Sequence, residues 1–138
     1  MMSENTKNYK AKLASLITKF PEKDLRKAKY ESLELPIGRK DEKIYRTDII
    51  ITFKKGIINF EMNLDYYQEL LGKNNSYIAK IRGEELDKGQ DYSELIKVAQ
   101  INLDDFHKFG KNRLIYEFQM REKETGEVLD EYMTVYHV

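Results

Sequence analysis

The sequence predicts an α+β domain in which a mixed β-sheet is built on a central hairpin and is flanked by helices, mostly on one side. Apolar residues recur at helical spacing near the N-terminus and again in the middle of the chain. Between and after these segments, apolar and polar residues alternate, as is typical of half-buried strands. The predicted order is helix, hairpin, helix, strand and hairpin, which favours an α+β architecture. With 138 residues, the chain is long enough for a single domain over 1–138.

The N-terminal segment, residues 1–34, is predicted to be basic and helical. A first helix over 6–20 follows from four apolar residues at helical spacing: Leu13, Leu16, Ile17 and Phe20. Pro21 ends this helix because proline lacks the amide hydrogen that a helix interior needs. Residues 22–32 are rich in charge and predict a second, short helical turn, and residues 33–37 predict a short edge strand.

The central hairpin is predicted over 44–63, with a turn at 54–56. Strand alternation groups three side chains on one face of the first arm: Asp48, Ile50 and Thr52. On the second arm it groups Ile57, Asn59, Glu61 and Asn63. Each arm therefore carries one carboxylate near the same end of the hairpin, and a buried carboxylate is costly unless it is paired or binds a metal. Asp48 and Glu61 together indicate a site for a hard cation such as Mg²⁺, which prefers oxygen ligands.

The second half of the chain is predicted to contain two short helices and three strands. Asp65 caps a helix over 66–71 that Gly72 ends. A second helix over 76–86 has its C-terminal stop at Gly89. The strands are predicted at 97–103, 114–120 and 132–138, the last two joined by a turn at 124–127.

Composition excludes several classes of protein. The sequence has no run of roughly 18 apolar residues, so a transmembrane helix and a membrane partner are not expected. Its first residues lack the apolar region of a secretory signal. The absence of cysteine excludes disulfides, thiolate catalysis and cysteine-ligated zinc, and fits a reducing compartment. We therefore expect a cytoplasmic protein.

Charge is unevenly distributed, although the net charge is +0. Residues 1–47 carry 12 Lys and Arg against 7 Asp and Glu, and residues 48–138 carry 12 against 17. The first third can therefore face a polyanion, although a solvated basic helix explains the same pattern. Zero net charge argues against strong nonspecific binding to DNA, which depends mainly on cations placed near phosphates.

Four stretches, in this order along the chain, carry a resemblance to a known family: 46–49 (RTDI), 58–63 (INFEMN), 85–95 (ELDKGQDYSEL) continuing to 101–106 (INLDDF), and 122–129 (EKETGEVL). They resemble motifs of the PD-(D/E)XK nuclease superfamily, and within it the transposase-like, recombination-promoting nuclease group of bacteria. The resemblance covers about residue 35 to the C-terminus. It implies a restriction-endonuclease-like core over 35–138. It also implies a metal-dependent DNA endonuclease that hydrolyses phosphodiester bonds and is linked to a mobile element.

The resemblance implies a role for each matching position. Asp48 and Glu61 would ligate Mg²⁺ or Mn²⁺, with the carbonyl of Met62 as a third ligand. The metal would activate a water molecule and stabilise the charge that builds on the scissile phosphate. Lys73 and Tyr77 match an Arg and a Tyr of the subgroup near the start of a helix, and the resemblance implies that they contact phosphate.

Asn63 stands where the superfamily has Lys and the subgroup has Gln, which gives it a catalytic role by resemblance. Its amide can orient a water molecule, but without a charge it cannot electrostatically support a hydroxide. This departure leaves a second function open. The protein would then be a catalytically inactive nuclease-fold module that binds DNA, or a phage or mobile-element regulator that acts on a protein partner.

Two further interpretations follow from the sequence. An edge strand at 33–37 or 132–138 can pair across a two-fold axis, which would make the protein a homodimer. His107 and His137 belong to no recognisable catalytic or metal-binding motif and are interpreted as surface or core residues.

Overall fold

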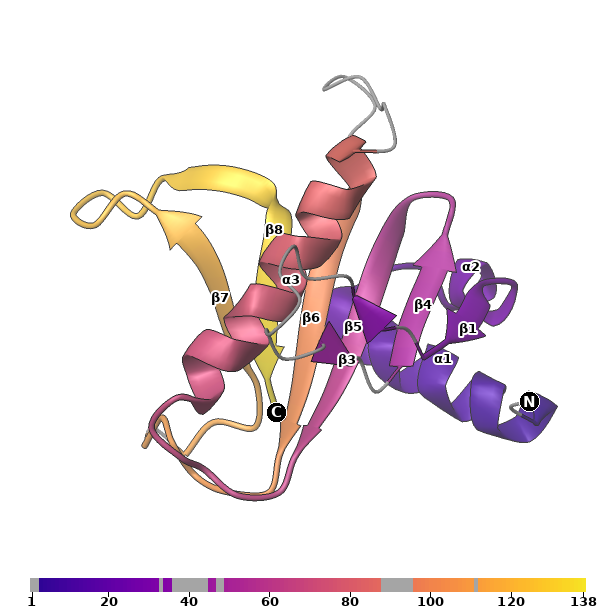
Figure 1. The fold of residues 1–138 in the computed structure, drawn as a ribbon, viewed down its shortest axis with the longest axis horizontal. Coiled ribbons are helices and arrows are strands. Elements are labelled where there is room, and N and C mark those ends of the chain that lie inside the picture. The colour runs from indigo at the N-terminus through magenta and orange to yellow at the C-terminus, as the bar shows by residue number, and fades with distance from the viewer. Residues whose placement is uncertain (1–2, 33, 36–44, 47–48, 88–95, 111) are drawn as a thin grey trace.

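The computed structural model describes residues 3–32, 34–35, 45–46, 49–87, 96–110 and 112–138. Within these residues the chain forms three helices, a six-stranded mixed sheet and a separate two-stranded sheet. The predicted α+β class with a mixed sheet is therefore confirmed, and the architecture is consistent with a restriction-endonuclease-like core (Figure 1).

The N-terminal segment forms two helices and one strand. Helix α1 (Glu4–Thr18) begins at Ser3, whose hydroxyl accepts a hydrogen bond of 3.2 Å from the Thr6 amide. It ends at Lys19, which adopts a left-handed conformation with φ of 68°. Helix α2 (Glu22–Arg26) is followed by strand β1 (Lys29–Glu31). The prediction of a helical turn over 22–32 is therefore wrong for its second half, because those residues pair with a neighbouring strand.

The central hairpin is formed by β4 (Ile49–Phe53) and β5 (Gly56–Asn63), with Ile49 opposite Phe60. Its predicted turn is confirmed, but the described part of its first arm is shorter than predicted. Strand β3 (Tyr45–Arg46) instead pairs with β2 (Glu34–Leu35) in the two-stranded sheet. Asp48 lies outside the described residues.

One long helix, α3 (Leu70–Asp87), replaces the two short helices predicted between 66 and 86. Gly72 does not end a helix, since it lies in the first turn of α3. A glycine inside a helix costs about 1 kcal/mol. Burial of one large apolar side chain contributes roughly 1.5–3 kcal/mol, and both Ile78 and Ile81 are buried on this helix. Packing therefore outweighs the local signal. The predicted stop at Gly89 lies outside the described residues.

The sheet is completed by three strands: β6 (Lys97–Asp104), β7 (Tyr116–Arg121) and β8 (Val128–His137). β6 runs parallel to β5 and to β8, whereas β7 and β8 form an antiparallel hairpin. The strand order is β1-β4-β5-β6-β8-β7. Residues 132–138 therefore do not form an edge strand as predicted, because β8 lies between two other strands. The edges of this sheet are β1 and β7.

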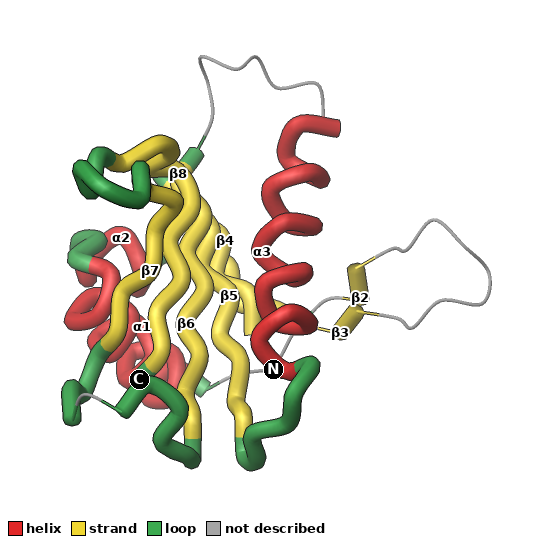
Figure 2. Tube along the Cα trace, turned by 90° about the vertical axis from the view of Figure 1, so that its left-hand side faces the viewer, coloured by secondary structure: helices red, strands yellow, loops and turns green. Residues whose placement is uncertain are grey.

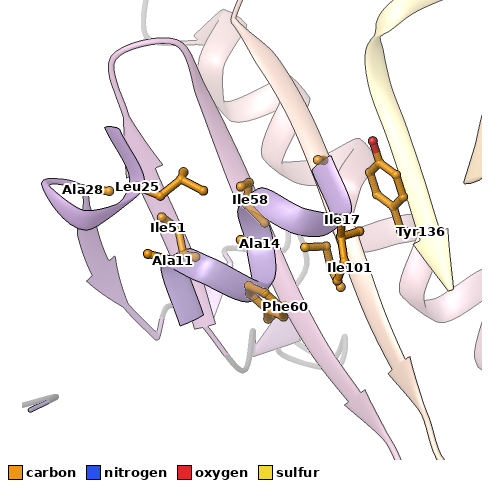
Figure 3. Close-up of a cluster of buried hydrophobic side chains, with 11 residues drawn as sticks. Ala11, Ala14, Ile17, Leu25, Ala28, Ile51, Ile58, Phe60, Ile101 and Tyr136 are labelled. Atoms are coloured by element: carbon orange, nitrogen blue, oxygen red, sulfur yellow. The ribbon is translucent and has the colours of Figure 1, made fainter. Parts of the chain in front are cut away.

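Helices cover both faces of the sheet. Figure 2 shows α1 and α2 against one face and α3 against the other. On the first face, Ala11 of α1 lies beside Ile51 and Ala14 lies beside Ile58, all in one apolar cluster (Figure 3). On the second face, Ile78 of α3 packs in a separate apolar cluster. Two of the three described helices lie on one face, as expected, but α3 covers the other, because β5 and β6 present apolar residues in both directions.

No helix among the described residues is long and apolar enough to cross a membrane. The apolar cluster beneath α3 includes Ile57 and Val98, which lie at the beginnings of β5 and β6. Farther along the same face of these strands, the side chains become polar, and this change marks the candidate site.

Candidate functional site

A band of buried polar side chains crosses the face of the sheet that α3 covers. We call it the polar ladder, and its members are Asn59, Glu61 and Asn63 of β5, Gln100, Asn102 and Asp104 of β6, His137 of β8 and Asn74 of α3. Side chains of alternate residues share a face of a strand. The two patterns Asn-x-Glu-x-Asn and Gln-x-Asn-x-Asp therefore place all six strand residues on one face. Because buried polar groups are costly unless they are paired, their hydrogen bonds define what the site can do.

The parallel register of β5 and β6 sets these residues opposite one another. Asn59 faces Gln100, Glu61 faces Asn102, and Asn63 faces Asp104. On the next strand, Asn102 is opposite His137. The ladder therefore runs along β5 and β6 and then across to β8.

Glu61 lies on β5 with only 5% of its surface exposed. The side-chain amide of Asn59 donates hydrogen bonds to Glu61 Oε1 at 3.0 Å and to Gln100 Oε1 at 3.2 Å. Asn59 Oδ1 is also buried, and no hydrogen-bond donor among the described residues reaches it. A buried acceptor of this kind calls for a bound water molecule or an ion.

The ladder attaches α3 to the sheet through Asn74. Gln100 donates from Nε2 to the carbonyl oxygen of Asn74 at 2.8 Å. The Asn74 side chain donates in turn to Asn63 Oδ1 at 2.9 Å. These two bonds join the first half of α3 to both β5 and β6, so the helix is positioned by the polar residues that it covers.

Both the nitrogen and the oxygen of the Asn63 side-chain amide form hydrogen bonds within the ladder. Its Nδ2 donates to Asp104 Oδ1 at 2.8 Å and lies 3.4 Å from Asn102 Oδ1, while Oδ1 accepts from Asn74. Both amide hydrogens are therefore used within the protein, and one lone pair of Oδ1 is left for another donor. Any water that Asn63 orients would have to donate to this oxygen.

The far end of the ladder is a buried pair between Asp104 and His137. Asp104 Oδ2 lies 2.6 Å from His137 Nδ1, and the two side chains are 6% and 5% exposed. Since a carboxylate only accepts, Nδ1 carries the hydrogen. The other ring nitrogen, Nε2, lies 3.4 Å from Asn102 Nδ2. The expectation that His137 is a surface or core residue misses this link to the candidate site.

The other residues implied by the resemblance are placed in different surroundings. Met62 is 59% exposed, since it points to the opposite face from Glu61. Tyr77 is 4% exposed and packs with Ile78 in the apolar cluster beneath α3. Lys73 lies in the first turn of α3. Asp48 lies outside the described residues.

Lys73 is electrostatically coupled to the ladder. Its Nζ lies 3.4 Å from the hydroxyl of Tyr67. Partial burial by itself lowers the pKa of Lys73, but the hydrogen bond to Tyr67 and the fields of Tyr77, Tyr67 and Glu61 outweigh it, so the net shift is upward. Lys73 therefore carries its positive charge within the electrostatic reach of Tyr77 and, more weakly, of Glu61.

Nearly the whole chain matches the model of a known protein family. A family model described as PD-(D/E)XK nuclease family transposase matches residues 3–138. The chain belongs to this family. A search of the curated proteins found no match. The resemblance in the sequence motifs begins near residue 35. The family match begins earlier, at residue 3, and so includes the N-terminal segment. Membership supports a nuclease-type function for the domain.

Proposed function

We propose that this protein is a metal-dependent DNA endonuclease in which Asp48, Glu61 and the carbonyl of Met62 hold Mg²⁺ or Mn²⁺. The observation that carries the proposal is the buried carboxylate of Glu61 on β5. Carboxylate oxygens are donors that hard divalent cations prefer. Family membership supports the same assignment, because nucleases of this family generally use divalent metals.

The described residues supply part of such a site. Among them, no group of three His, Cys, Asp or Glu side chains is placed to hold a metal ion. The donors at Glu61 fit a cation that keeps several water ligands and takes a further carboxylate from Asp48. When bound, the metal would act as a Lewis acid and generate the attacking hydroxide.

The protein's own residues would then orient the reaction. Asn59 fixes Glu61, and Asn74 and Asp104 fix Asn63, so the donor oxygens are held before a substrate arrives. Lys73 places a positive charge near Glu61, where a phosphate group of DNA would approach. Because the ladder is buried and internally bonded, binding of DNA would require little rearrangement of these groups.

A second candidate function is favoured by the hydrogen bonds of Asn63. Both of its amide hydrogens are used inside the ladder, and it carries no charge to support a hydroxide. This arrangement is compatible with a catalytically inactive member of the family that binds DNA. It is equally compatible with a regulator that binds a protein partner.

Cleavage of supercoiled plasmid and of single-stranded DNA separates the two candidates. Wild type, Glu61→Gln, Asn63→Gln and the control Glu124→Gln are incubated in Mg²⁺, in Mn²⁺ and in EDTA. Glu124 is exposed in the β7–β8 turn, far along the chain from the ladder. The endonuclease proposal predicts metal-dependent nicking by wild type and by Glu124→Gln, and its loss in Glu61→Gln. Cleavage by Glu61→Gln at the wild-type rate would contradict it. Activity gained only in Asn63→Gln would support the silent-member function.

A further inference from the structure

A cavity lies beside Asp104 and His137, at the far end of the polar ladder. The loop between β6 and β7 encloses a cavity of about 660 Å³ whose wall includes Asp104 and His137. The other lining residues that matter here are Lys108, Phe109, Arg113 and Tyr116. We call this space the loop cavity. Its volume lies within the range of small-ligand sites in proteins.

One wall of the loop cavity is aromatic. The ring of Phe109 lies 5.3 Å from that of Tyr116 and 5.0 Å from that of His137, measured between centroids. The backbone amide of Arg113 donates to the Tyr116 hydroxyl at 3.3 Å, which ties the loop to this wall. The rings are tilted by 45° and 60° from that of Phe109, and each can offer an apolar face or edge to another ring.

The rim of the loop cavity is basic. Lys108 and Arg113 are exposed, and each is held over a tyrosine ring, Lys108 at 4.7 Å from Tyr66 and Arg113 at 5.8 Å from Tyr116. Asp104 is an acidic residue in the wall, but both of its oxygens are already bonded within the ladder. The cavity therefore combines stacking surface with positive charge.

We infer that the loop cavity binds one nucleotide of single-stranded DNA, with the base against Phe109 and Tyr116 and a phosphate at Arg113 and Lys108. Aromatic rings beside a basic rim are what single-strand binding sites use, because every base has a stacking face and every linkage has a charge. A base inside a duplex cannot present its face in this way without leaving the stack.

The position of the loop cavity relative to Glu61 indicates which form of DNA the protein would cleave. This inference rests on the proposed function, since it assigns a class of substrate to the same site. Two strand spacings separate Glu61 on β5 from His137 on β8, which is about 10 Å. A stacked strand advances about 3.4 Å per nucleotide. Because the base contacts Phe109, whose ring centroid is 5.0 Å from that of His137, the bound nucleotide would lie within about five positions of the phosphate at Glu61, and the substrate is unpaired near the cut.

The test measures binding without cleavage. Fluorescence anisotropy in EDTA compares an oligothymidine with an abasic oligomer of the same length, which keeps the phosphates and lacks the bases. The proteins are wild type, Phe109→Leu, Arg113→Gln and Lys123→Gln, a matched control whose cation is exposed in the β7–β8 turn. Wild type should prefer the oligothymidine by about tenfold, the effect of a single base stacked on an aromatic side chain.

Each variant should change one component of binding. Phe109→Leu should reduce the preference for bases towards one and leave the affinity for the abasic oligomer unchanged. Arg113→Gln should weaken both oligomers equally and reduce the slope of log affinity against log salt by about 0.7, as expected for one lost phosphate contact. Lys123→Gln should behave as wild type. A Phe109→Leu protein that keeps the tenfold preference would overturn the inference.

Two further results keep this inference separate from the proposed function. If Phe109→Leu does not fold, as judged by thermal unfolding, an unchanged salt slope in Arg113→Gln overturns the inference by itself. If wild type cleaves DNA while the cavity variants bind as wild type does, only the nucleotide cavity is refuted. If Glu61→Gln and wild type bind alike and neither cleaves, yet Phe109→Leu loses the preference for bases, the cavity is supported and the endonuclease proposal is refuted.

Discussion

Replacement of Asp104 by leucine tests whether the polar ladder is a bonded unit. Asp104 accepts from Asn63 at 2.8 Å and pairs with His137 at 2.6 Å, and its side chain is 6% exposed. Each hydrogen bond to a charged group contributes roughly 1.5–3 kcal/mol, so two give about 3–6 kcal/mol. Burial of the leucine offsets roughly 1.5–3 kcal/mol of that loss. We therefore expect Asp104→Leu to lower the free energy of unfolding by about 1.5–3 kcal/mol.

Urea unfolding followed by circular dichroism measures this change, since the midpoint shifts at constant slope when only stability changes. Asp105→Leu is the matched control, because Asp105 is adjacent and exposed and its replacement should stay within about 0.5 kcal/mol of wild type. The double variant Asp104→Leu/His137→Leu should lose less stability than the two single variants added together, because neither partner is then left buried alone. An Asp104→Leu protein as stable as Asp105→Leu would refute the reasoning.

Three other predictions concern separate parts of the molecule. Glu61→Gln should lower the raised pKa of Lys73 slightly, because Glu61 contributes to the upward shift less than the hydrogen bond to Tyr67 and the fields of Tyr77 and Tyr67. An unchanged or higher pKa in an NMR titration of the lysine side chain would mean that the two groups are not coupled. Burial raises the pKa of Tyr136 to about 12 from a model-compound value of 10.0, so its contribution to stability is complete below pH 10 and is lost as pH rises towards 12. Alkaline unfolding of Tyr136→Phe should therefore show a smaller loss over this window than wild type, and equal losses would contradict the assignment. Gly56→Ala should destabilise the protein by roughly 1–3 kcal/mol, because a Cβ there would lie 2.7 Å from the Lys97 carbonyl oxygen. The control Gly72→Ala should be neutral or stabilise α3 by up to about 1 kcal/mol, because a Cβ there would have no atom within 4 Å. Chemical denaturation measures both variants, and a Gly72→Ala protein less stable than Gly56→Ala would contradict both expectations.

The parts of the fold that the sequence predicts well are those with strong strand periodicity. Alternation from Ile57 to Asn63 places Glu61 on the same face as Asn59, and the structure has this arrangement. The strand over 97–103 is also confirmed, as β6. In both strands one face is apolar and the other becomes polar after one apolar residue, Ile57 or Val98, so the local pattern and the tertiary packing agree.

The failures arise where tertiary contacts decide. Gly72 carries a local stop signal, but α3 continues through it because residues farther along the helix are buried against the sheet. The edge or interior position of a strand depends on its partners, and nothing within residues 132–138 indicates that β8 lies between β6 and β7. Local pattern therefore predicts elements better than their neighbours.

The local sequence predicts only part of the candidate site. Glu61 and Asn63 are found from one strand, but the pairing of Asp104 with His137 joins positions that are 33 residues apart. The alternation Gln100-x-Asn102-x-Asp104 is a signal that could have pointed to a polar face on β6. Its connection to His137 depends on the parallel register of β6 and β8, which no local pattern encodes.

The most direct test of the central claim is calorimetric titration of Mn²⁺ into the wild-type protein, Glu61→Gln and Glu124→Gln. The claim is that the Glu61 end of the polar ladder is the metal centre of a nuclease. It predicts saturable binding to wild type and to Glu124→Gln, and its loss in Glu61→Gln while thermal unfolding remains cooperative. Equal binding heats in all three proteins would contradict the claim.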